Sequence, residues 1–342
     1  MNDLPNLLHK RATIALMGAR RQDDSRMREA LRAAQLYYLQ DLTMDAIGDE
    51  LNVSRSSVSR LLDMARTLGI VDIQINSPED GPRRIEGEIS NRFSVSAHLV
   101  PVPEGTTPVD RLERVAVSAA RMLSKFFSSS MTMGIAWGST ISAVSRHLPS
   151  RITANSQIVQ LNGAGNDQTS GVDYSGEILR RFGEAFSAQI QHFPAPAFFD
   201  NPKAKSFLWE ERSTQRILDL QKRSDVALFG LGSTDAEVPS QVYAGGYLSA
   251  PEIAALRDEG IVGDVATVFY RADGTWEDID ANKRSSGPGL DVIRAIPRRV
   301  CVVSGPKRLE ALRGALAAGV ITDIIFDEST ARALLGTAQK TT

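Results

Sequence analysis

Beyond about residue 95, short apolar segments alternate with helix-like segments, and this alternation constrains the fold more than any other feature of the sequence. The strand-like segments are 98–102, 131–135, 157–161, 225–229, 300–303 and 323–326, and the helix-like segments lie near 109–127, 138–147, 175–187, 206–222, 251–258 and 307–318. The alternation predicts a largely parallel sheet with helices on both faces, because parallel strands need crossover connections. The expected fold class is therefore α/β, with a doubly wound domain over residues 96–338.

The composition excludes several classes of protein. Hydrophobic residues make up 42% and charged residues 23% of the 342 residues, which argues against collagen-like, disordered and coiled-coil chains. The single cysteine, Cys301, lies in the apolar segment 299–303, so we expect a buried structural thiol in a reducing cytoplasm. No apolar run is as long as a membrane span, and basic residues flank the apolar stretch 12–19 on both sides. We therefore expect a cytoplasmic protein with no membrane contact.

The N-terminal region follows a different pattern. Residues 1–24 lack a sustained apolar period and are expected to form a mobile tail. Helical spacing runs from Met27 to Leu39, Thr43 caps a second helix, and Ser54 caps a third helix that stops at Gly69. A strand with period-two apolar residues is predicted at 70–75, and residues 78–95 are expected to form a linker helix. Three short helices, a tight turn and a strand predict a winged helix-turn-helix over residues 25–77.

The third helix of this region has the chemistry of a DNA recognition helix. Small hydroxyls permit close approach to a major groove, and arginines reach guanine edges or phosphates. The expected DNA-binding residues are Thr43, Ser54, Arg55, Ser56, Ser59 and Arg60. The first 77 residues hold 10 basic and 10 acidic residues, so DNA contact depends on this local cluster. A generic three-helix bundle with a solvated polar face is the alternative.

Turns rich in small residues follow three predicted strands of the larger domain. Gly138, Ser139 and Thr140 lie where a strand passes into a helix and can offer amides and hydroxyls to a phosphate, although the lysine of a nucleotide P-loop is missing. Segments 161–165 and 229–233 follow two further strands without completing a dinucleotide fingerprint. Because the carboxyl ends of parallel strands meet at one edge, these turns together predict a ligand site. Each turn alone is equally consistent with a plain strand-to-helix connection.

The remaining polar candidates are less specific. Asp264, Lys307 and the acidic pair 327–328 could bind a ligand or be surface charges. The four histidines have no metal-ligand spacing, and neither a nucleophile elbow nor a Cys/His pair occurs. We therefore expect no metal, no cofactor and no catalytic residue.

Taken in order, these segments resemble the SorC/DeoR-type sugar-binding transcriptional regulators. The resemblance covers about residues 27–336 and rests on 33–39, 51–62, 134–140, 263–264 and 307–331. It implies a helix-turn-helix joined to a sugar-phosphate-isomerase-like effector domain. The residues it assigns to the effector are Gly138, Ser139 and Thr140 for a phosphate, Asn162, Gly163 and Gly232 for the pocket wall, Asp264 for sugar hydroxyls, and Lys307 for the phosphate or a hydroxyl. The chain departs from the family pattern at Ser304-Gly-Pro306 and Phe326-Asp-Glu328.

The expected function is therefore a DNA-binding regulator of a carbohydrate or polyol catabolic operon, and not an enzyme. Its expected partners are operator DNA, a phosphorylated sugar or polyol, and further copies of the chain. We expect a dimer or tetramer because a single helix-turn-helix contacts too few bases, whereas an oligomer would read two half-sites. Two alternatives stay open. The larger domain could be a sugar-phosphate isomerase or deaminase with an accessory domain, or an oligomerisation scaffold with a vestigial pocket.

Overall fold

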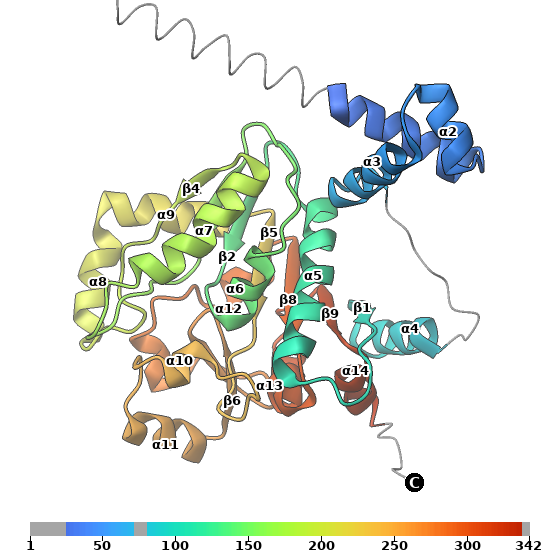
Figure 1. Ribbon diagram of the computed structural model, residues 1–342. Coiled ribbons are helices and arrows are strands. Elements are labelled where there is room, and N and C mark those ends of the chain that lie inside the picture. The colour runs from blue at the N-terminus through green and yellow to red at the C-terminus, as the bar shows by residue number, and fades with distance from the viewer. Residues whose placement is uncertain (1–24, 72–80, 337–342) are drawn as a thin grey trace, which may run out of the picture. The chain divides into compact units, whose positions relative to one another are not determined.

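The computed structural model describes residues 25–71 and 81–336 (Figure 1). The chain divides into two compact units, Met1–Ser77 and Pro78–Thr342. The expected tail over 1–24 and most of the expected strand over 70–75 lie outside the described residues, so the wing stays a prediction. Among the helices that the structure describes, none is long and apolar enough to cross a membrane.

Unit 1 contains three helices, as the sequence predicts. They are a helix over 25–39, α2 (Met44–Leu51) and α3 (Arg55–Thr67). Both predicted N-caps are confirmed, because the hydroxyls of Thr43 and Ser54 accept hydrogen bonds from amides three residues later, each at 3.2 Å. Gly48 permits the tight turn between α2 and α3, since a Cβ there would lie 2.8 Å from the carbonyl oxygen of Val53.

Unit 2 is built on one sheet of seven parallel strands in the order β1-β9-β8-β5-β2-β3-β4. The strands are β1 (Ser96–Val100), β2 (Thr132–Ile135), β3 (Gln157–Gln160), β4 (Gln189–Gln191), β5 (Val226–Gly230), β8 (Arg298–Val303) and β9 (Asp323–Asp327). A separate antiparallel hairpin consists of β6 (Ile261–Val265) and β7 (Val268–Arg271).

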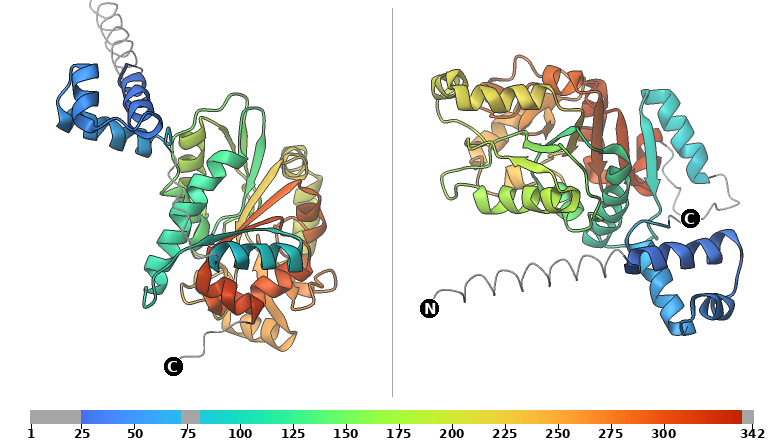
Figure 2. Two further views of the ribbon diagram at one scale, coloured as in Figure 1. Left: turned by 90° about the vertical axis from the view of Figure 1, so that its right-hand side faces the viewer. Right: turned by 90° about the horizontal axis from the view of Figure 1, so that it is seen from above.

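Helices cover both faces of this sheet, as Figures 1 and 2 show. The helices are α4 (Gly81–Phe93), α5 (Pro108–Phe126), α6 (Ser139–Ser145), α7 (Val172–Phe186), α8 (Pro202–Glu210), α9 (Arg212–Lys222), α10 (Gln241–Ala244), α11 (Ala250–Asp258), α12 (Leu290–Ala295), α13 (Leu309–Ala317) and α14 (Glu328–Leu335), with 3-10 turns η1 (Asp280–Lys283) and η2 (Pro306–Arg308). Helices α5, α6 and α7 share an apolar core with one face, and α4, α12, α13 and α14 share a core with the other. The predicted α/β class and doubly wound sheet are confirmed.

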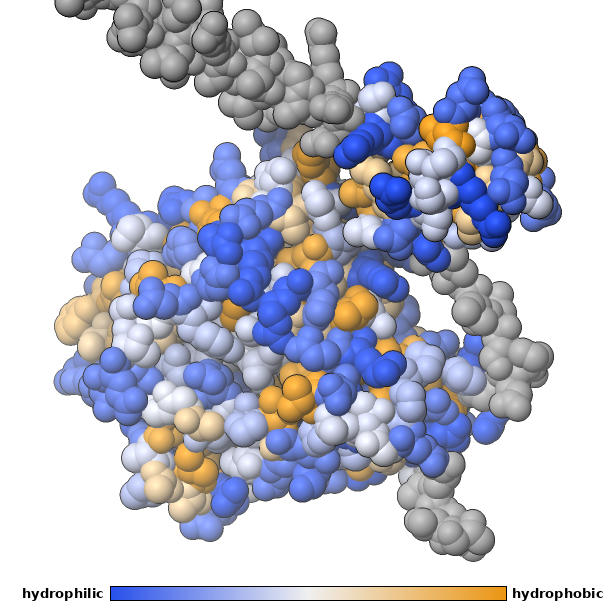
Figure 3. All heavy atoms as spheres, viewed as in Figure 1, coloured by the Kyte–Doolittle hydropathy of each residue, from blue (hydrophilic) through white to orange (hydrophobic). Residues whose placement is uncertain are grey.

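The two cores follow from period-two burial along the strands. In β8, Val300 and Val302 belong to one core, whereas Cys301 and Val303 belong to the other. Cys301 is buried and unpaired, as expected for a structural thiol. With these apolar residues inside, the face in Figure 3 shows apolar residues scattered among hydrophilic ones.

Several elements differ from the predicted ones. The segment 206–222 is not one helix, because Glu211 has extended backbone (ψ 133°) between α8 and α9. Strand β4 and the β6–β7 hairpin were not predicted, and neither were α10, α12 and η1. Helix α4 is grouped with unit 2, where Ile85 and Ile89 are buried in the core.

Candidate functional site: a pocket at the switch point of the sheet and a helix-turn-helix

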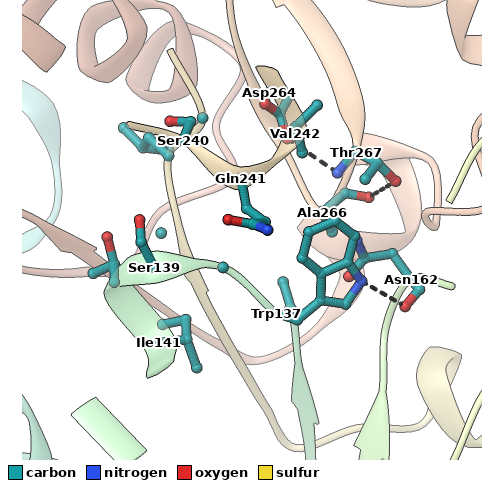
Figure 4. Close-up of a pocket in the computed structure, with 16 residues that line it drawn as sticks. Trp137, Ser139, Ile141, Asn162, Ser240, Gln241, Val242, Asp264, Ala266 and Thr267 are labelled. Atoms are coloured by element: carbon teal, nitrogen blue, oxygen red, sulfur yellow. Dashed lines mark hydrogen bonds between the residues drawn. The ribbon is translucent and has the colours of Figure 1, made fainter. Parts of the chain in front are cut away.

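The sheet reverses its winding direction between β2 and β5, and this reversal creates a crevice. From β2 the chain proceeds outward to β3 and β4, whereas from β5 it proceeds the other way to β8 and β9. Connections therefore leave the carboxyl ends of β2 and β5 in opposite directions, which is where open α/β sheets bind ligands. A small pocket lies here, lined by residues from the ends of β2, β3 and β5 and from the β6–β7 hairpin (Figure 4).

One wall of this effector pocket is the turn that leaves β2. Gly138 has φ 153°, and Ser139 and Thr140 begin α6. The hydroxyl of Ser139 donates to the carbonyl oxygen of Pro239 at 3.4 Å. Thr140 packs against Gly230 at the end of β5, where a Cβ would lie 3.1 Å from the threonine Cβ. The missing side chain at Gly230 thus lets the two strand ends approach each other.

Asp264 supplies the only ionisable side chain on the wall of the pocket among the described residues. Its side chain is buried, and Oδ2 accepts the amide hydrogen of Thr267 at 3.1 Å, while Oδ1 has no hydrogen-bond partner. Burial raises the pKa of Asp264 to about 6, although the amide of Thr267 and the nearby hydroxyl of Tyr243 oppose this rise. Gly232 gives the carboxylate its space, because a Cβ at residue 232 would lie 1.7 Å from Oδ1.

The hairpin turn beside Asp264 is strained. Ala266 and Thr267 both have positive φ, 49° and 68°, where β-branched residues are rarely found. The Thr267 amide donates to Asp264, and the Thr267 hydroxyl lies 3.0 Å from the Ser285 hydroxyl. The surrounding contacts therefore hold an unfavourable backbone that positions the carboxylate.

The third wall comes from the end of β3. The indole N–H of Trp137 donates to the carbonyl oxygens of Gly163 at 2.8 Å and Asn162 at 3.2 Å, and so ties the end of β2 to the end of β3. The ring of Tyr247 stacks on Trp137 with centroids 4.9 Å apart. The side-chain oxygen of Asn162 is buried and has no partner. The pocket thus holds two unpartnered acceptors, one from Asn162 and one from Asp264.

The structure brings together most of the effector residues expected from the sequence, but not all. Those that line the pocket are Gly138, Ser139, Thr140, Asn162, Gly232 and Asp264. Gly163 lies behind the wall, where its amide donates to the Ser286 hydroxyl at 2.9 Å. Lys307 is exposed on η2 and does not line the pocket. The residue after it, Arg308, is buried and bonds to backbone carbonyls.

Sequence reasoning missed the wall contributed by segment 240–242 and the strained turn 266–267. Neither segment directly follows a strand of the parallel sheet, so the rule that ligands bind at the carboxyl ends of parallel strands does not point to them. Only the polar pattern Ser240-Gln241 hinted at function, and it is common in loops.

The DNA-binding residues expected in unit 1 are all exposed. They are Thr43, Ser54, Arg55, Ser56, Ser59 and Arg60. The opposite side of α3 holds Val58, Leu62 and Ala65 in the core of the unit. A contact at 3.7 Å joins Arg55 to Asp45, but both side chains are 70% exposed, so the pair leaves the guanidinium accessible.

The described residues contain no cluster of His, Cys, Asp and Glu that could hold a metal ion. The pocket offers a ligand hydrogen bonding, with the carboxylate of Asp264, the carboxamides of Asn162 and Gln241, and several hydroxyls.

Comparison with known proteins agrees with both units. Residues 78–336 match the family model described as "Putative sugar-binding domain", and residues 24–67 match "Sigma-70, region 4". The deoxyribonucleoside regulator of Bacillus subtilis (strain 168) is 28% identical over 316 residues, which cover 92% of this chain and 99% of the relative.

Solved structures give the same result. A domain of "a possible sugar-binding transcriptional regulator" from Arthrobacter aurescens TC1 is 48% identical with a TM-score of 0.71, and the match covers 76% of this chain and all of that one. The full-length sorbitol operon regulator SorC from Klebsiella pneumoniae shares the fold at 23% identity, with a TM-score of 0.67 over 92% of this chain and 99% of SorC. The family match covers most of the chain, and the chain belongs to the SorC/DeoR-type sugar-binding transcriptional regulators.

Proposed function

We propose that this regulator controls a carbohydrate or polyol catabolic operon, and that a phosphorylated sugar or polyol in the effector pocket changes its affinity for operator DNA. The observation that carries the proposal is the pair of buried, unpartnered acceptors on Asn162 and Asp264. Unpartnered buried acceptors cost free energy, and a ligand with adjacent hydroxyls would supply the missing donors. Ser139 and Thr140, on another wall, would hold the phosphate.

In this proposal Arg55 and Arg60 contact base edges or phosphates, and copies of the chain form a dimer or tetramer on two half-sites. The mechanism is linkage. An effector that binds the DNA-competent and DNA-incompetent states with different affinity must change DNA affinity by the same coupling free energy, typically about 1–3 kcal/mol.

The test needs an operator and a panel of ligands. An operator is selected from a pool of random duplex DNA with the full chain, and its affinity is measured by fluorescence anisotropy. Sugars, polyols and their phosphates are then screened by thermal shift. We expect at least one phosphorylated ligand to raise the melting temperature and to change the dissociation constant for the operator by about 5-fold to 150-fold. A ligand that binds without changing operator affinity would contradict the proposal, and so would a panel with no hit.

A further inference from the structure

The effector pocket provides no side-chain cation for a phosphate. None of the described residues that line it is lysine, arginine or histidine. The nearest buried cation, Arg308, is already bound to the carbonyl oxygens of Leu231 at 3.3 Å, Ser304 at 2.9 Å and Val238 at 2.9 Å. A phosphate in this pocket must therefore be held by neutral donors.

Repulsion limits where that phosphate can lie. The Asp264 carboxylate is buried, and no cation lies within ion-pair distance of it in the described parts of the chain. A phosphate beside it would meet an unscreened like charge, which is unfavourable. The phosphate must then lie at the Ser139 side of the pocket, away from Asp264 (Figure 4).

Gln241 is the side chain that supplies further donors at this place. It begins α10 and projects into the middle of the pocket, between Ser139 and Trp137 (Figure 4). A carboxamide carries two N–H donors, and those of Gln241 make no hydrogen bond to any residue of 25–71 or 81–336. It is thus an uncommitted donor group aimed into a ligand cavity.

The segment that carries Gln241 is anchored, so the side chain is held in position. Arg111 on α5 forms an ion pair with Glu237 at 2.8 Å, and both side chains are largely buried, at 17% and 22% exposure. Arg308 fixes the carbonyl of Val238, and Ser139 donates to the carbonyl of Pro239, two residues before Gln241. The segment 237–241 is therefore fastened to the body of unit 2 and to the turn of Ser139.

We propose that Gln241 is a specificity-determining residue of the effector pocket, and that its carboxamide reads the phosphate of the effector together with the hydroxyl of Thr140 and that of Ser139, which would turn to the phosphate from the carbonyl oxygen of Pro239, 3.4 Å away. This inference rests on the proposed function and adds to it that recognition uses a neutral amide where a lysine or arginine is usual. Because no side-chain cation takes part, the charge of residue 241 sets the affinity for phosphorylated ligands. A negative charge there should lower this affinity, and a positive charge should raise it.

The test compares Gln241→Glu and Gln241→Lys with the wild-type full chain. Gln215→Glu on α9 is the matched control, because it makes the same change of charge at an exposed position outside the pocket. The probes are matched pairs of a sugar and its phosphate: ribose and ribose 5-phosphate, glucose and glucose 6-phosphate, fructose and fructose 6-phosphate, and sorbitol and sorbitol 6-phosphate. Binding is measured by tryptophan fluorescence, since Trp137 lines the pocket.

We expect Gln241→Glu to weaken binding of the sugar phosphate by about 100-fold, with little effect on the parent sugar, because a carboxylate would face the phosphate. Gln241→Lys should tighten sugar-phosphate binding through a charge-assisted bond, and Gln215→Glu should behave as wild type. Should Gln241→Glu fail to fold, the tightening by lysine remains a sufficient test.

Two failures can be told apart. If wild type and both Gln241 variants bind a sugar phosphate equally, the role of Gln241 is refuted while the proposed function stands. If wild type binds no sugar phosphate, or binds the parent sugar as tightly, the phosphorylated effector is refuted and the role of Gln241 with it.

Discussion

Replacing Asp264 by asparagine should stabilise unit 2 at neutral pH although it removes a ligand contact. Burial raises the pKa of this carboxyl from 3.8 to about 6. The folded state therefore binds the proton more tightly than the unfolded chain, and stability falls as the pH rises through this interval. Above pH 6 the protein carries the full cost of a buried carboxylate. Asparagine keeps the shape and an acceptor for the Thr267 amide but carries no charge.

The magnitude follows from the two pKa values. A rise from 3.8 to about 6 corresponds to about 3 kcal/mol of unfolding free energy lost at pH 7.5. At pH 4 the carboxyl is protonated in the folded state and about half ionised in the unfolded chain, so less than about 1 kcal/mol is lost. Since some hydrogen bonding to Tyr243 is lost as well, we expect Asp264→Asn to gain about 1–3 kcal/mol at pH 7.5 and little at pH 4.

Urea unfolding of the full chain at the two pH values measures this difference. All three tryptophans, Trp137, Trp209 and Trp276, lie in unit 2, so their fluorescence reports its unfolding alone. The control is Asp323→Asn. Burial raises the pKa of Asp323, but the hydrogen bond from Thr322, the imidazole of His98 at 3.8 Å and the charge of Arg298 outweigh burial and lower this pKa. Its loss should destabilise the protein at pH 7.5. The reasoning is refuted if Asp264→Asn destabilises unit 2 equally at both pH values.

Three further outcomes are expected. Arg60→Ala should weaken operator binding by about 1–3 kcal/mol if the side chain is bidentate to a base, whereas Arg66→Ala, in the last turn of α3, should change it little. If fluorescence anisotropy gives the two variants equal affinities for the operator, Arg60 does not contact a base. Gly232→Ala should weaken effector binding at least about 10-fold, because the new Cβ would displace the carboxylate of Asp264, and operator binding without effector should persist. Trp137→Phe should lower the unfolding free energy by about 1–3 kcal/mol, because the carbonyl groups of Asn162 and Gly163 lose their indole donor. If urea unfolding shows no change, these two hydrogen bonds do not hold the ends of β2 and β3 together.

The sheet was predictable because its central strands are short apolar runs bounded by turns. Segments such as 226–229 and 300–303 are buried on both faces and therefore apolar throughout. Strand β4, Gln189–Gln191, lacks this signal because it is a three-residue edge strand with polar ends. The break at Glu211 was also unpredictable, since neither proline nor glycine marks it.

About half of the pocket could be predicted, and the rest depends on distant parts of the chain. The turn at Ser139 and the loop at Asn162 follow strands, so the topology of parallel sheets was enough to point to them. Gln241 reaches the same cavity from a segment 100 residues beyond Ser139, positioned by the ion pair between Arg111 and Glu237. The resemblance in sequence points to Lys307, but Lys307 is exposed while its neighbour Arg308 is buried, and burial is a property of the fold.

Three features of the pocket share a physical character. The turn of Ala266 and Thr267 adopts an unfavourable backbone, Asp264 is a buried carboxylate without a cation, and Asn162 holds an unpartnered oxygen. Each of them lowers stability, and all three lie at one cavity at the switch point of the sheet. A folded chain can keep such costs where another requirement opposes stability. Other buried atoms without a partner, on His98, Trp276 and Arg299, lie outside this cavity. The combination at this cavity supports the proposed ligand site, because a ligand with hydroxyl donors would pair the two acceptors that the chain itself leaves unpaired.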